Sequence, residues 1–137
     1  MKLSTRVRYG ARALCALARN YPSPSVSLTV IARREGVSVK YLEQIMMPLR
    51  AAGLVVANAG AKGGYALSRA PARIRMSEVY EVLDGSPTLV PCISNPARCP
   101  RSKKCPTQPL WAAVNRAIHR ELHRTRLSDL VNARRTR

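Results

Sequence analysis

The segment 27–49 carries two short amphipathic helix patterns separated by a glycine, and this arrangement restricts the possible folds more than any other feature. Ser27 can cap a helix over 28–34 that ends before Gly36, and Ser38 can cap the next helix. In that next helix the apolar residues recur at helical spacing, at Leu42, Ile45, Met46 and Leu49. Two short helices joined by a glycine-containing turn form the helix-turn-helix pattern, whose second helix enters the major groove of DNA.

A longer helix before this pattern and a β-hairpin after it complete the expected arrangement. Ser4 can cap the first helix, whose apolar residues recur up to Ala18, before prolines in the segment 20–25 end it. Two short apolar runs, 54–57 and 65–68, flank a glycine-rich loop, which is the pattern of a β-hairpin. After a helix-turn-helix, such a hairpin is the wing of a winged-helix domain. Neither the dinucleotide-binding nor the P-loop glycine spacing is present in the loop.

The second half of the chain is also expected to be helical. A helix fits 77–83, and Thr107 can cap a longer amphipathic helix. Because little core remains for this long helix to cover, it suits packing against a second copy of the chain; folding back on its own domain is the alternative. Pro48, inside the second helix of the pattern, is expected to bend that helix or alter its end. Residues 133–137 resemble a disordered basic tail.

The predicted fold is mainly α with a small β-hairpin wing. It divides into a winged helix-turn-helix DNA-binding domain (1–85), a cysteine loop (86–106), a dimerisation helix with a C-terminal segment (107–132) and the basic tail (133–137).

The charge of the chain indicates a polyanionic partner. The formal net charge is +17, and residues 1–50 hold nine basic and two acidic residues. A basic N-terminal half suggests double-stranded DNA, while general cationic solubility or an acidic membrane surface is the alternative. No apolar run approaches the roughly eighteen residues of a membrane span, so a cytoplasmic protein without a membrane partner is expected. Two histidines and seven acidic residues in no paired-carboxylate arrangement argue against an enzyme.

The DNA contacts are expected mainly at the start of the second helix of the pattern. Lysine pairs with guanine, glutamine with adenine and glutamate with the cytosine amino group, so the base-contact candidates are Lys40, Gln44 and Glu43. Phosphate contacts, which set register and affinity, are expected from Ser4, Arg6, Tyr41 and Lys62, and Ser38 completes the predicted DNA-binding set. For Tyr41, packing at the start of its helix is a second role that can coexist with the first.

Three of the four cysteines, Cys92, Cys99 and Cys105, lie in a polar, proline-rich and cationic stretch. Neighbouring positive charge favours the thiolate, the form that binds metals. The gaps of six and five residues are wider than those of zinc ligand pairs and suit an iron–sulfur cluster better. Zinc, a disulfide switch without metal and three ordinary surface cysteines remain open as alternatives.

The chain resembles the Rrf family of winged-helix transcription regulators, whose IscR-like and NsrR-like members bind iron–sulfur clusters. The matching residues are the three loop cysteines and 3–4, 8–9, 36–38, 41–44, 49–50, 53–55, 60, 63–67, 110–111 and 127–131. The resemblance implies a homodimeric repressor or activator with a 2Fe-2S or 4Fe-4S cluster at Cys92, Cys99 and Cys105. It also implies that the long helix forms the dimer and that the state of the cluster adjusts DNA binding.

The chain departs from the family pattern at the fourth cluster ligand. Gln108 stands where IscR-like members carry a histidine, and Arg8 stands where NsrR-like members carry an acidic residue. Cys15, another side chain, an exogenous thiol or water are the alternatives, and Cys15 equally fits the edge of the core. Ala59 replaces a common minor-groove arginine at the wing tip, where Lys62 can supply charge instead.

Overall fold

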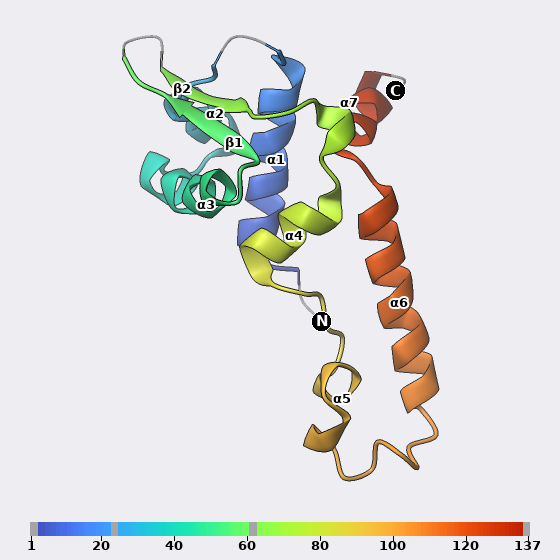
Figure 1. The fold of residues 1–137 in the computed structure, drawn as a ribbon. Helices are drawn as coiled ribbons and strands as arrows, with labels where there is room; N and C mark the ends of the chain where they lie inside the picture. The colour runs from blue at the N-terminus through green and yellow to red at the C-terminus, as the bar shows by residue number, and fades with distance from the viewer. Residues whose placement is uncertain (1–2, 23–24, 61–62, 136–137) are drawn as a thin grey trace.

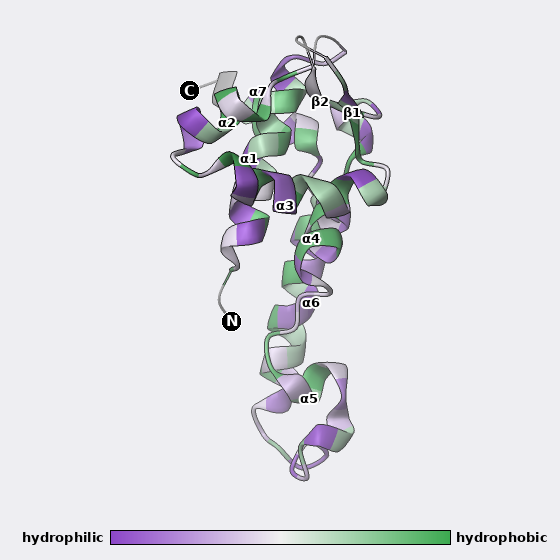
Figure 2. Cartoon of the chain, turned by 90° about the vertical axis from the view of Figure 1, so that its left-hand side faces the viewer, coloured by the Kyte–Doolittle hydropathy of each residue, from purple (hydrophilic) through white to green (hydrophobic). Residues whose placement is uncertain are grey.

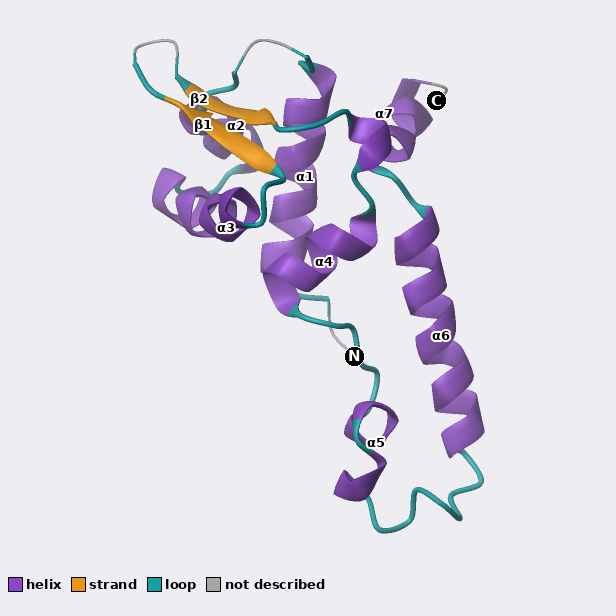
Figure 3. Cartoon of the chain, viewed as in Figure 1, coloured by secondary structure: helices purple, strands orange, loops and turns teal. Residues whose placement is uncertain are grey.

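The computed structural model describes residues 3–22, 25–60 and 63–135. They form a helical domain with a small hairpin, from which a long C-terminal helix extends (Figure 1). The elements in chain order are α1 (Thr5–Arg19), α2 (Leu28–Glu35), α3 (Val39–Ala51), β1 (Val55–Asn58), β2 (Gly64–Leu67), η1 (Pro71–Arg73), α4 (Met76–Asp84), α5 (Pro91–Ser94), η2 (Pro96–Arg98), α6 (Gln108–Arg124) and α7 (Leu127–Arg135). The prediction of a mainly α fold with a hairpin wing is confirmed (Figure 3).

The first three helices begin at the serines that the sequence indicates. Ser4, Ser27 and Ser38 each accept a hydrogen bond at Oγ from a backbone N–H in the first turn of α1, α2 and α3. Gly36 ends α2 in the left-handed conformation, with φ of 69°. A left-handed residue is easiest for glycine, so the turn between α2 and α3 is encoded locally.

The core lies where α1 packs against α3, α4 and α7. Its fully buried side chains come from every part of the domain and include Leu14, Ile31, Leu42, Ile45, Met46, Leu49, Ile74, Val79 and Leu127. Figure 2 shows hydrophobic and hydrophilic stretches alternating along the helices. Since the chain has no phenylalanine, the core consists mainly of aliphatic side chains.

The hairpin pairs β1 and β2 antiparallel, with Val55 opposite Leu67 and Asn58 opposite Gly64. A further antiparallel bridge joins Val26, in the connection from α1 to α2, with Tyr65 of β2. Both of its hydrogen bonds form, Val26 N to Tyr65 O at 2.8 Å and Tyr65 N to Val26 O at 2.9 Å. The wing is therefore fixed to the helix-turn-helix and not only to the core.

The helix α3 continues through Pro48 to Ala51, and the completely buried Leu49 lies in its last turn. One expectation about a helix end needs correction. The basic tail is not wholly irregular, because α7 continues to Arg135. Packing of α7 against α1 and η1, anchored by the completely buried Leu127, explains the extension. None of the helices within the described ranges is long and apolar enough to cross a membrane.

Candidate DNA interface and cysteine loop

The helix α3 separates a buried face from an exposed face. Leu42 and Ile45 are completely buried, whereas Lys40, Glu43 and Gln44 are exposed. In the described part of the chain, no hydrogen bond or ion pair engages these three exposed side chains. The predicted base-contact residues therefore share an unoccupied helical surface.

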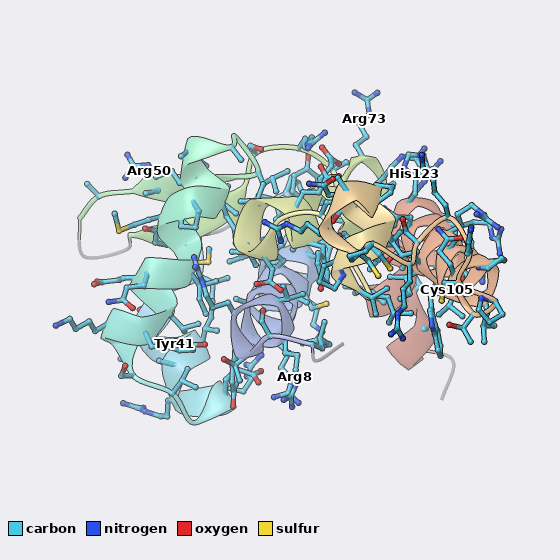
Figure 4. All side chains as sticks on the ribbon, turned by 90° about the horizontal axis from the view of Figure 1, so that it is seen from below. Arg8, Tyr41, Arg50, Arg73, Cys105 and His123 are labelled. Carbon is cyan, nitrogen blue, oxygen red and sulfur yellow. The ribbon has the colours of Figure 1, made fainter. Side chains whose placement is uncertain are left out.

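Tyr41 joins the start of α3 to α1. Its hydroxyl donates a hydrogen bond to Thr5 Oγ1 at 3.1 Å, and its half-buried ring meets the Tyr9 ring edge to face, with centroids 6.0 Å apart. Figure 4 shows Tyr41 on α3 beside α1. The contacts of Thr5 and Tyr9 could not be read from the sequence. Because the Thr5 hydroxyl accepts a hydrogen bond from Tyr41, the proton of the Thr5 hydroxyl can be donated to a phosphate. The Tyr41 oxygen can in turn accept a hydrogen bond from another donor.

The other predicted phosphate contacts within the described residues lie at or near the starts of helices. Ser4 accepts from Val7 N at 3.2 Å, and Ser38 accepts from Tyr41 N at 3.0 Å. A capping hydroxyl uses its oxygen as acceptor, so its proton can still be donated to a phosphate. Arg6 is exposed on α1. Lys62 lies outside the described residues.

Replacing Ser38 with alanine is expected to lower the free energy of unfolding by about 1 kcal/mol, because the Tyr41 N–H loses its acceptor. Ser38→Asp restores an acceptor and should recover that stability, but its negative charge would repel DNA phosphates. Urea unfolding followed by circular dichroism measures the first effect, and fluorescence anisotropy with duplex DNA measures the second. Equal DNA affinity of Ser38→Asp and the wild type would contradict the placement of Ser38 at the interface.

The cysteine loop lies at the far end of α6 from the wing and contains short helical turns (Figure 1). Cys92 is part of α5, Cys99 directly follows η2, and Cys105 precedes α6. All three thiols are free and half-buried. Within the loop, α5 and η2 begin with Pro91 and Pro96, because proline favours the first position of a helical turn.

Two hydrogen bonds fix the beginning of the cysteine loop on α6. The Leu89 N–H donates to Asn115 Oδ1 at 2.8 Å, and His119 Nε2 lies 2.8 Å from Pro87 O. Asn115 is the buried residue of α6 in the described ranges. A lone asparagine in an amphipathic helix gave no signal of this contact in the sequence.

The thiols differ in their local chemistry. The Thr107 hydroxyl, 3.2 Å from the sulfur, is the main reason why the pKa of Cys105 is lowered. Burial raises the pKa of Cys15, which packs against the core from α1. The surroundings of Cys105 therefore favour its thiolate, whereas those of Cys15, at the edge of the core, disfavour it.

Cys105 is expected to be alkylated faster than Cys15 near pH 7, because a lowered pKa increases the thiolate fraction and a raised pKa decreases it. Iodoacetamide labelling of the metal-free protein with peptide mass spectrometry gives both rates. Thr107→Val should slow the labelling of Cys105 alone. Equal rates at Cys105 in Thr107→Val and the wild type would contradict the assigned cause.

The chemistry of the donors fits an iron–sulfur cluster, since the loop holds three thiols and residues 86–106 include no Asp, Glu or His. Their positions are not those of a closed metal site: the described residues include no group of three or more His, Cys, Asp or Glu side chains placed to hold a metal ion. The thiols would thus have to approach one another to hold a cluster.

The comparison with known families settles the class of the protein. A family model described as Rrf2, iron-dependent transcriptional regulator, matches residues 3–133. The chain belongs to the Rrf2 family. Proteins of the Rrf2 family regulate transcription and are not enzymes, so this chain is a transcription regulator, and both the resemblance and the expectation of a non-enzyme are confirmed.

Relatives in the Rrf2 family match nearly the whole chain. Protein rrf2 of Nitratidesulfovibrio vulgaris is 38% identical over 131 residues, which cover 96% of this chain and 87% of that protein. The regulator IscR of Cereibacter sphaeroides is also 38% identical, over 136 residues, with the same coverage. The solved structure of CymR, the global cysteine regulator of Bacillus subtilis, has a TM-score of 0.79 and 36% identity, covering 97% of this chain and 98% of that chain.

The two positions where the Rrf2 pattern expects a fourth cluster ligand are occupied by poor ligands. Gln108 is half-buried at the first position of α6, with its backbone N–H 3.4 Å from Cys105 O. Arg8 is exposed on α1 and lies in a different part of the molecule from Cys105 (Figure 4). A guanidinium has no lone pair to donate, so Arg8 is excluded as a ligand.

Proposed function

We propose that this Rrf2-family protein is a cytoplasmic homodimer whose affinity for a double-stranded DNA operator is modulated by an iron–sulfur cluster held by Cys92, Cys99 and Cys105. The observation that carries the proposal is the set of three free, half-buried thiols in one loop at the start of α6. The description of the family as iron-dependent supports the choice of iron. Bound to its operator, the protein would act as a repressor or an activator of transcription.

The loop would gain order when it takes up a cluster. It carries the cations Arg98, Arg101, Lys103 and Lys104 and no acidic residue from 92 to 106, so its charges repel one another. Three thiolates would offset this repulsion and fix the chain on both sides of Cys99. The cluster would supply chemistry sensitive to iron, oxygen or nitric oxide, and the protein would supply the ligands and the transmission to DNA.

The exposed apolar face of α6 supports a homodimer. Leu110, Trp111 and Val114 are 54%, 37% and 37% exposed on the helix that has Asn115 as its buried residue. Such a stripe on a long helix suits an equivalent helix in a second copy. A dimer would present two α3 helices to successive major grooves of a pseudo-palindromic operator.

A contact path connects the loop with the DNA-binding surface. The helix α6 packs against α4, and α4 packs against both α1 and α3. A change at the start of α6 would therefore reach α3 through a packed helix, which is the physical requirement for coupling between two sites.

The test is anaerobic purification of the full chain, with iron and sulfide analysis, native mass spectrometry and affinity for an operator selected from random duplex DNA. We expect a coloured, cluster-containing dimer, and a colourless but folded variant carrying Cys92→Ser, Cys99→Ser and Cys105→Ser. Their operator affinities should differ about tenfold or more. Cys15→Ser, a control outside the loop, should keep the cluster. Equal operator affinity of the loaded wild type and the triple variant would refute the modulation.

A disulfide-switched regulator without a cluster is the second candidate function. The lowered pKa of Cys105 favours it, because the thiolate is the form that reacts with oxidants. It requires a colourless protein whose operator affinity changes with diamide and returns with dithiothreitol.

Gln44→Ala is expected to weaken binding to the selected operator by about 1–3 kcal/mol, with relaxed preference at one base pair. Binding to unrelated duplex DNA should stay unchanged, because phosphate contacts dominate it. Anisotropy titrations with the operator, its single-base variants and unrelated DNA measure both effects. Equal losses of affinity for all three kinds of DNA would mean that Gln44 contacts the DNA backbone rather than a base.

A further inference from the structure

A groove separate from the DNA-binding face and from the cysteine loop lies among α1, α2 and α7. Its volume is about 510 Å³, which is within the size range of small-molecule sites. The lining residues are Ala11, Arg12, Cys15 and Arg19 of α1, Arg34 and Glu35 of α2, and Leu130 of α7. No part of the proposed DNA or cluster function uses this groove.

Positive charge in the groove exceeds negative charge. Arg12 Nη1 lies 3.3 Å from Glu35 Oε2, in the groove's one ion pair within the described residues. Over the same described ranges, Arg19 and Arg34 have neither a hydrogen bond nor a carboxylate partner for their guanidinium groups. Two guanidinium groups without anions thus line one concave space.

The remaining walls are mainly apolar. Ala11 and Leu130 are apolar, and Leu130 is 37% exposed. Burial raises the pKa of the Cys15 thiol, which disfavours its charged, nucleophilic form. The groove is therefore suited to reversible binding through charge and apolar contact.

We propose that this groove binds a small organic dianion, held by Arg19 and Arg34 and packed against Ala11 and Leu130, and that the bound dianion changes operator affinity. Guanidinium groups form paired hydrogen bonds with both carboxylates and phosphates, so a dicarboxylate and a phosphate ester share the required chemistry. The proposal rests on the DNA-binding function alone and is independent of the cluster.

The groove is connected to the recognition helix α3 by consecutive contacts. Arg12 Cζ lies 5.6 Å from the centre of the Tyr9 ring, and the Tyr9 ring meets the Tyr41 ring of α3 at 6.0 Å. Glu35, the partner of Arg12, is the last residue of α2. An anion near Arg12 competes with Glu35 for that guanidinium, and so acts on both helices of the helix-turn-helix.

Binding is tested by calorimetry on the full chain with glutarate, methyl phosphate and the neutral glutaramide. One or both dianions should bind the wild type, and Arg19→Gln with Arg34→Gln should weaken the binding about tenfold or more. The matched control, Arg8→Gln with Arg33→Gln, removes the same charge from exposed positions of α1 and α2 outside the groove and should leave the affinity within about twofold. Equal weakening in both double variants, or dianion binding no tighter than that of glutaramide, overturns the proposal.

Coupling is tested by operator anisotropy at constant ionic strength. A saturating dianion should change operator affinity about fivefold or more in the wild type and in the triple cysteine variant. The change should disappear in Arg19→Gln with Arg34→Gln, and in Tyr9→Leu, which interrupts the ring contact while dianion binding persists. A change that survives in the arginine variant would reveal general charge screening and overturn the proposal. Loss of the change only in the triple cysteine variant would overturn its independence from the cluster.

Discussion

Leu42→Ala is expected to lower the free energy of unfolding by about 2–5 kcal/mol, a large part of the stability of a domain of this size. Leu42 is completely buried between α3 and the rest of the core, so alanine leaves a cavity that the neighbouring helices fill only in part. Urea unfolding followed by circular dichroism measures the effect.

Met47 supplies the matched control for Leu42, because it lies on the same helix and its side chain is 65% exposed. Met47→Ala is expected to change the free energy of unfolding by no more than about 0.5 kcal/mol. Similar losses for the two variants would mean that α3 turns a different face toward the core. The exposed positions of Lys40, Glu43 and Gln44 would then also be wrong.

Gly64→Ala is expected to detach the wing from the helix-turn-helix. Gly64 has a φ of +144°, and an added Cβ would lie 2.6 Å from the Val26 carbonyl carbon and 2.9 Å from Ser27 N. These are backbone atoms that cannot rotate away, so the Val26–Tyr65 bridge must open. Strain of about 1–3 kcal/mol adds to the two lost hydrogen bonds.

Gly60→Ala is the control that separates the steric effect of an added Cβ from the cost of a positive φ. Gly60 also has a positive φ, +99°, but an added Cβ meets nothing within 4 Å. Gly60→Ala should therefore lower the free energy of unfolding only by the cost of placing an alanine at a positive φ. Urea unfolding gives the stability difference, and anisotropy with unrelated duplex DNA shows whether the detached wing weakens phosphate binding. Equal stability of the two variants would contradict the close approach of Gly64 to Val26.

Ligand binding at the dianion groove and at the cysteine loop would affect α3 through two separate contact paths. The loop reaches α3 through α6 and α4, whereas the groove reaches it through Arg12, Tyr9 and Tyr41. Because the two paths enter α3 from different helices, the effects of cluster and dianion on operator affinity should be close to additive in free energy.

Much of the DNA-binding domain could be predicted because its signals are local. The caps Ser4, Ser27 and Ser38 and the left-handed Gly36 each act within one turn of the chain, and the structure has them where the sequence indicates. Burial of Leu42 and Ile45 follows from helical periodicity for the same reason. The DNA-binding residues on α3 could thus be predicted because helix caps and helical periodicity act between residues close together in the chain.

For the cysteine loop, the sequence indicates the candidate ligands but not their arrangement in space. Spacing and charge identify Cys92, Cys99 and Cys105 as candidate ligands, but their relative positions depend on α5, η2 and on the anchors at Asn115 and His119. The lowered pKa of Cys105 comes mainly from the Thr107 hydroxyl, and Arg101, one of the cations that the sequence places nearby, contributes less.

The sequence by itself determined the starts of α1, α2 and α3, the turn of the helix-turn-helix and the hairpin, because these depend on residues close together in the chain. The expected cap of α6 at Thr107 was wrong, since the Thr107 side chain accepts no capping hydrogen bond. Membership of the family also follows from the sequence, through a match over residues 3–133. Only the tertiary structure decided which distant residues meet. The hydrogen bond from Tyr41 to Thr5 and the groove shared by Arg12, Arg34 and Leu130 join different helices. The continuation of α3 beyond Pro48 and of α7 to Arg135 is likewise a result of packing. Burial against other helices outweighs the local preferences that would end these two.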